Sequence, residues 1–139
     1  MYENQQSAAP GTLSAALSAA AEEVESLHGA TVDVVTVGDC PLDERLSALV
    51  AAAREAMVNA AKWSGVTTVS VYAEVRDGEV SAYVRDWGSG FDLAAVGPDH
   101  HGIRESITGR MQRHGGSAVV RATPGEGTEV QLRMGGETR

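Results

Sequence analysis

Apolar residues recur at helical spacing in three stretches of the chain. In the second stretch, for example, Leu49 and Met57 fall on one apolar stripe. Residues that favour helix ends accompany the pattern, since Thr12 is a good N-cap and Gly29 and Gly65 are good stops. The spacing predicts helices over residues 12–27, 42–63 and 103–114.

Segments rich in β-branched residues lie between and after these helices. The dipeptide Asp77-Gly78 is a strong hairpin signal, and Pro124-Gly-Glu-Gly127 indicates a second hairpin. Residues 86–101 contain several glycines and a proline, and they are predicted to form a loop. Strands are predicted over residues 31–37, 68–76, 79–85, 117–123 and 128–133.

The order of these elements predicts an α+β fold. We expect a two-layer α/β sandwich, with three helices on one face of a mostly antiparallel sheet of about five strands. Residues 12–134 would form one domain, preceded by a flexible lead-in over residues 1–11 and followed by a C-terminal tail over residues 135–139.

The charge balance excludes several partners. The 139 residues include 11 Lys and Arg against 19 Asp and Glu, a net charge of −8. Nucleic acids and anionic membranes are bound through clustered basic residues, so neither is an expected partner. No apolar run approaches the roughly 20 residues that span a bilayer. The single Cys40 cannot form an internal disulfide, which fits a reducing compartment. We expect a cytoplasmic domain, which could lie at the cytoplasmic end of a membrane-anchored sensor.

Three polar side chains line one edge of the second predicted helix. Glu55, Asn59 and Lys62 are spaced i, i+4 and i+7, which places them on one helix face. Asn59 is a plausible Mg²⁺ ligand and Lys62 a plausible phosphate contact, because Mg²⁺ takes few protein oxygens together with substrate phosphates. On spacing alone, an ordinary solvated helix edge explains the same pattern.

Eleven of the 16 glycines follow Asp86. In the segment Asp86-Trp-Gly88-Ser-Gly90, the glycines permit close approach of a ligand to the backbone. The carboxylate of Asp86 could accept a hydrogen bond from an exocyclic amine such as that of adenine. A plain turn after a strand is the alternative.

Two further segments offer groups to an anion. In His101-Gly102-Ile103-Arg104, the glycine is predicted to open a helix whose free N–H groups could hold phosphate oxygens, with Arg104 one turn inside. Gly127-Thr128 could present a hydroxyl to a ligand. Ordinary helix capping and turn chemistry are the alternatives for these two segments.

In this order the four segments resemble the ATP-binding catalytic domain of two-component sensor histidine kinases, which belongs to the GHKL superfamily and has the Bergerat fold. The resemblance extends over about residues 34–134. The run from Gly102 to Gly116 is similar to that of the nitrate-sensor and desaturase-regulating subgroup. The matching elements are the N box (Glu55-x-x-x-Asn59), the G1 box (Asp86-x-Gly88-x-Gly90), the G2 box (Gly102-Ile103) and the terminal Gly-Thr element (Gly127-Thr128).

The resemblance implies an enzyme that binds Mg·ATP. The γ-phosphoryl group would pass to a histidine on a separate dimerisation domain, and only indirectly to a response regulator. Asn59 would hold Mg²⁺ through the phosphates, Lys62 would face the phosphates, and Asp86 would accept the adenine amino group. Thr128 would support the adenine through water.

The same resemblance assigns the remaining motif residues. Gly88 and Gly90 would shape the pocket, and Gly102 would let a lid close over the triphosphate. Glu55 has two possible roles, because the matching residue polarises water in hydrolase relatives, whereas the attacking group in kinases is a histidine of another domain.

Two features depart from the family pattern. Trp63 stands where the family usually carries His, and none of the four histidines has an acceptor's helical setting beside an acid. We therefore expect Mg·ATP binding without self-phosphorylation. Two alternatives stay open: an anti-sigma-factor serine kinase of the same fold, and a degenerate nucleotide-sensing module without transfer activity.

Overall fold

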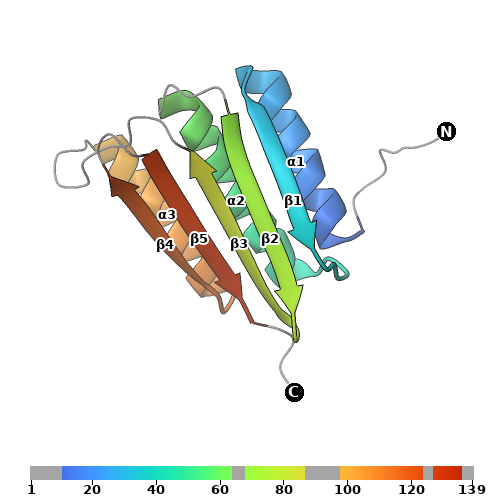
Figure 1. The fold of residues 1–139 in the computed structure, drawn as a ribbon. Helices are drawn as coiled ribbons and strands as arrows, with labels where there is room; N and C mark the ends of the chain where they lie inside the picture. The colour runs from blue at the N-terminus through green and yellow to red at the C-terminus, as the bar shows by residue number, and fades with distance from the viewer. Residues whose placement is uncertain (1–10, 64–67, 87–97, 124–126, 136–139) are drawn as a thin grey trace.

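The computed structural model describes residues 11–63, 68–86, 98–123 and 127–135 of the chain (Figure 1). Three helices and five strands are present in this part. The helices are α1 (Leu13–His28), α2 (Glu44–Trp63) and α3 (Pro98–Arg113). The strands are β1 (Thr31–Val37), β2 (Thr68–Arg76), β3 (Glu79–Asp86), β4 (Ser117–Thr123) and β5 (Gly127–Met134).

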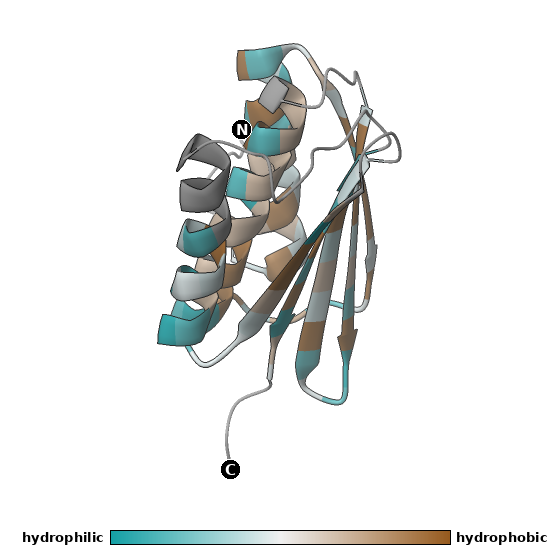
Figure 2. Cartoon of the chain, turned by 90° about the vertical axis from the view of Figure 1, so that its left-hand side faces the viewer, coloured by the Kyte–Doolittle hydropathy of each residue, from teal (hydrophilic) through white to brown (hydrophobic). Residues whose placement is uncertain are grey.

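The strands form one mixed sheet with the order β1-β2-β3-β5-β4. Strand β1 pairs with β2 in parallel, and every other neighbouring pair is antiparallel. All three helices lie on the same side of this sheet (Figure 2). The predicted two-layer α+β sandwich is confirmed.

Side-chain caps fix the starts of the first two helices. The N–H of Ala15 donates to Thr12 Oγ1 at 3.2 Å, and the N–H of Leu46 donates to Asp43 Oδ1 at 2.8 Å. These contacts satisfy N–H groups that have no partner inside the helix. Helix α2 therefore begins at Glu44, two residues after the predicted start at position 42, because Asp43 is its N-cap.

The predicted hairpin between β2 and β3 is also present. Asp77 and Gly78 both have positive φ, 54° and 79° respectively. Two successive residues of positive φ are what a type I′ turn needs, and Asp-Gly supplies them at low cost. This turn sets the register in which Tyr72 lies opposite Tyr83.

Helix α3 corrects two predictions. It begins at Pro98, so residues 98–101 belong to the helix and not to a loop. Gly102 consequently lies inside the helix, and the prediction that it opens the helix is wrong. Proline is well suited to the first helical position because its missing N–H would have no intrahelical partner there. The apolar spacing that identified this helix starts only at Ile103, which explains the late predicted start.

The hydrophobic core fills the space between the two layers. Each helix contributes one apolar stripe to the core. Each strand contributes every second residue, namely those on the face toward the helices. The largest side chains buried to below 2% exposure include Leu17, Leu49, Met57, Ile107 and Leu132.

Gly116 should be irreplaceable for a packing reason. A Cβ there would lie 2.5 Å from the carbonyl oxygen of Arg133, which is backbone and cannot rotate away. We expect Gly116→Ala to lower the free energy of unfolding by about 2 kcal/mol. As the matched control, Gly109→Ala meets only the mobile end of Arg113 at 3.3 Å, and it should raise stability by about 0.5–1 kcal/mol because it removes a glycine from a helix. Urea denaturation measures both, and equal effects would contradict the packing argument.

Candidate functional site

Four chain segments that carry the sequence motifs meet at one end of the sandwich. Strand β3 ends there, strand β5 begins there, helix α2 ends there and helix α3 begins there, at the upper edge of Figure 1. Helix α2 packs against β3, β5 and α3. Segments far apart in the sequence are thereby gathered into one candidate site.

Asp86 and Thr128 form the buried polar centre of this end. They lie opposite each other in the register of β3 and β5. Asp86 is 1% exposed and Thr128 is 7% exposed, and within the described part of the chain no other polar or charged residue is classed as buried. Burying a carboxylate is costly unless it is paired or hydrogen-bonded. The fold keeps Asp86 inside the molecule where the sequence predicted an adenine contact.

Asn59 supplies a polar atom that the protein leaves unsatisfied. It lies one turn before the end of α2, and its Oδ1 is buried with no hydrogen-bond partner among the described residues. Buried amide oxygens are normally paired, so this one needs an explanation. An oxygen atom held ready in this way fits a ligand of Mg²⁺, which prefers oxygen donors.

Glu55 is engaged by helix α3. Its Oε1 accepts a hydrogen bond from Ser106 Oγ at 3.2 Å and pairs with Arg110 Nη1 at 3.3 Å. The two donors come from successive turns of α3, so they face α2 together. Sequence reasoning missed Ser106 and Arg110, because their i, i+4 spacing shows only that they share a helix face and not what that face contacts.

For most of the other predicted site residues, the structure describes the backbone position only. Gly127 is the first residue of β5 and has a φ of 109°, which favours glycine. Lys62 lies in the last turn of α2, and Gly102, Ile103 and Arg104 lie in the first half of α3, with side chains outside the described part. Gly88 and Gly90 fall outside the described residues.

An ion pair beside the site joins α2 to α1. Arg54 Nε lies 2.9 Å from Glu23 Oε1. The Arg54 guanidinium holds the pKa of Glu23 below its usual value through this hydrogen bond and its charge. Helix α2 is thus tied to α1 through Arg54 and to α3 through Glu55.

In the described segments, no group of three His, Cys, Asp or Glu side chains is placed to hold a metal ion. None of the described helices is long and apolar enough to cross a membrane.

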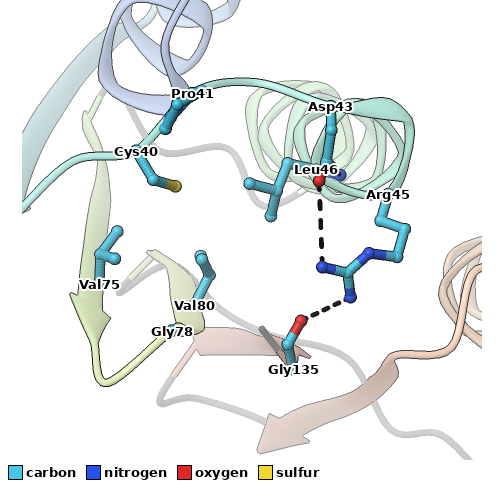
Figure 3. A pocket seen from close by; sticks show the side chains of 9 residues that line it. All are labelled: Cys40, Pro41, Asp43, Arg45, Leu46, Val75, Gly78, Val80 and Gly135. Carbon is cyan, nitrogen blue, oxygen red and sulfur yellow. Dashed lines mark hydrogen bonds and ion pairs between the residues drawn. The ribbon is translucent and has the colours of Figure 1, made fainter. Parts of the chain in front are cut away.

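A separate hollow of about 320 Å³ lies at the opposite end, where α2 begins (Figure 3). Arg45 spans it and donates to the carbonyl oxygen of Gly135 at 2.6 Å, with Asp43 3.9 Å away. The thiol of Cys40 also lines it, and burial raises the pKa of that thiol, as do the charges of Asp39 and Asp43. A protonated thiol is a poor nucleophile, and no predicted site residue lines this hollow.

Solved structures of similar fold include one ATP-binding domain and two histidine kinases. The ATP-binding domain of PrrB from Mycobacterium tuberculosis has a TM-score of 0.73 and 23% identity, covering 94% of this chain and 98% of that one. The mycobacterial sensor histidine kinase MprB has a TM-score of 0.69 and 19% identity, covering 92% and 97%. The blue-light-activated histidine kinase of Erythrobacter litoralis EL346 has a TM-score of 0.70 and 20% identity, covering 88% and 41%.

This chain spans about two fifths of the light-activated kinase. No family model matches the sequence, and no curated protein matches it. The structural likeness nevertheless extends over almost all of the chain and almost all of the PrrB domain. The chain has the fold of the ATP-binding domains of sensor histidine kinases.

Proposed function

We propose that this chain is the ATP-binding catalytic domain of a sensor histidine kinase. It binds Mg·ATP at the end of the sandwich where Asp86 lies and donates the γ-phosphoryl group to a histidine on a separate dimerisation domain. A response regulator then receives the phosphoryl group from that histidine. The observation that carries the proposal is the burial of Asp86 opposite Thr128, in a fold whose solved examples include ATP-binding domains.

Asp86 and Thr128 suit the adenine. A carboxylate accepts hydrogen bonds, so Asp86 can recognise the exocyclic amine of adenine and disfavour a base with a carbonyl at that place. Thr128, directly across the strand pair, offers a hydroxyl that can reach the ring through water. Such recognition is selective because a base with a carbonyl at that place offers the carboxylate no hydrogen-bond donor.

Asn59, Lys62 and Arg104 suit the triphosphate. Asn59 would hold Mg²⁺ through its free Oδ1, and the two cations lie on elements that reach the same end. Mg²⁺, when bound, neutralises part of the charge that develops on the phosphates during transfer. The chain has a net charge of −8, and ATP is also an anion. The affinity for ATP therefore depends on these local groups and not on the electrostatic field of the whole chain.

Glu55 acts here by positioning. Its Oε1 accepts from Ser106 and pairs with Arg110, and these two contacts hold the carboxylate against α3. Through these contacts Glu55 fixes α3, which carries the G2 residues, against α2, which carries Asn59. Phosphoryl transfer relies mainly on positioning and charge neutralisation, and a fixed α2–α3 pair serves both.

Asp86→Asn tests the adenine contact. We expect ATP affinity, measured by calorimetry with Mg²⁺ present, to fall about 10- to 100-fold, because a charge-assisted hydrogen bond is lost. The nearly isosteric change should leave the fold intact by circular dichroism. The matched control is Asp77→Asn in the hairpin turn, where φ is 54° and Asn is tolerated. Unchanged ATP affinity in Asp86→Asn would refute the proposal.

Asn59→Ala tests the metal contact and separates function from stability. We expect the variant to be more stable than the parent, with a free energy of unfolding that is higher by about 1 kcal/mol. The substitution removes an unsatisfied buried oxygen and improves helix propensity. ATP affinity with Mg²⁺ should fall about 10-fold, to the level seen with EDTA. Gln112→Ala, at an exposed position of α3, is the control. A destabilised variant with normal Mg²⁺ dependence would show that Asn59 is only structural.

Transfer is tested with γ-labelled ATP. The chain alone should incorporate no label, and a dimerisation domain with an acceptor histidine, added in trans, should acquire acid-labile label. Phosphate release by the chain alone should match a protein-free control, because Glu55 positions α3 and does not activate water in this proposal. Self-labelling, or steady hydrolysis that Glu55→Gln abolishes, would contradict this assignment.

A further inference from the structure

The face of the sheet opposite the helices carries exposed apolar side chains. Helices cover only one side of the sheet (Figure 2). Five large hydrophobic residues are exposed in the described part of the chain, and four of them lie on the uncovered face: Val35, Val37, Tyr72 and Val119, with exposed fractions of 57%, 47%, 38% and 44%. Solvent-facing positions of an antiparallel sheet are normally polar, and exposed apolar patches mark interaction sites.

Most of these residues lie in one row across all five strands. The strand registers place Val35 opposite Tyr72, Tyr72 opposite Tyr83, Tyr83 opposite Gln131, and Gln131 opposite Val119. The two tyrosine rings are 6.2 Å apart between centroids. A shallow hollow of about 390 Å³ adjoins the tyrosines. We call these five residues the central row.

Charged residues flank the central row in equal numbers of each sign. The neighbouring row on one side contains Asp33, Arg85, Glu129 and Arg121, and the row on the other side contains Glu74 and Arg133. The face is thus electrically neutral, three acids against three bases, on a chain with a net charge of −8. The charge of this face therefore does not repel a second copy.

We propose that the uncovered sheet face binds a second copy of this chain. The two copies are related by a twofold axis that runs along the central row, so each residue of that row meets itself. The axis exchanges the two flanking rows. Glu129 then faces Arg133 of the second copy, and Arg133 faces Glu129 of that copy, since both lie on β5 two residues from Gln131.

The remaining flanking charges are compatible with this axis. Arg85 faces Ser81 of the second copy, and Glu74 faces Ser70, so no like charges stand directly opposite. A twofold axis parallel to the strands would instead place Arg85 against Arg85 at the centre of the contact. Like charges taken out of water at that point are costly, which favours the axis along the row.

The ion pairs that Glu129 and Arg133 make within one copy are long. Within one copy, Glu129 lies 3.8 Å from Arg85, and Arg133 lies 4.0 Å from Glu79. Ion pairs of this length at the surface contribute little. A contact of Glu129 with Arg133 across the interface can therefore replace them at low cost.

The size of the face sets the expected affinity. Five strands about 4.8 Å apart and about five residues long bury on the order of 1,000 Å² in total when two copies meet. This area is at the small end of specific interfaces. We expect a weak dimer, with a dissociation constant on the order of 100 µM.

Sedimentation analysis of the full chain between about 10 µM and 1 mM tests the proposal, which does not depend on ATP binding. The parent chain should shift from monomer to dimer over this range. Tyr72→Lys places two lysines against each other and should weaken dimerisation about 100-fold. The matched control is Leu27→Lys, at the exposed apolar residue of α1 (63% exposed), which should dimerise normally. Thermal unfolding confirms that both variants fold.

A charge exchange tests the axis. Glu129→Arg and Arg133→Glu should each weaken the dimer about 10-fold, because each sets like charges opposite. The double variant should restore parental affinity, since the pair is re-formed with its signs exchanged. A monomer at 1 mM, a dimer insensitive to Tyr72→Lys, or a double variant that fails to recover would overturn the proposal.

Discussion

The packing of helix α2 on the middle of the sheet is the contact on which the rest of the structure depends. This helix touches α1, α3 and strands β2, β3 and β5. Its buried side is built largely of alanine, with Ala52, Ala53, Ala56 and Ala60 at 6% exposure or less. Small side chains let the helix lie close to the strands, and Leu49 and Met57 fill the remaining space. No other helix could be moved without losing a contact to α2.

The same helix explains how the candidate site is held. Glu55 lies at its border with α3, and Asn59 follows one turn later with its Oδ1 buried. A ligand-binding site of this kind needs polar atoms that are held in place but have no hydrogen-bond partner in the protein. Such unpaired atoms lower the free energy of unfolding. The apolar side of α2 supplies the stabilisation that keeps an unpaired oxygen in Asn59 and a buried carboxylate in Asp86 tolerable.

Much of this arrangement was visible in the sequence because it is local. Helical spacing, the cap at Thr12 and the Asp77-Gly78 turn each depend on a few neighbouring residues, and the structure confirms all of them. The start of α3 was missed because Pro98 begins a turn without an apolar stripe. The pairing of Glu55 with Arg110 joins positions 55 residues apart, and no local pattern reports such a contact. Sequence motifs named Asp86 and Thr128, but only the strand register shows that they are opposite each other.

Alternation along the strands lets one sheet serve two purposes. In β3, Val84 and Asp86 point inward, toward the core and the candidate site, while Tyr83 and Arg85 point outward. A change of a single residue in register would exchange the two sets and place Asp86 in solvent. The register that builds the site is therefore the same one that aligns the tyrosines on the outer face. For a chain with a net charge of −8, the neutrality of the outer face depends on the local composition of the strands and not on the overall charge.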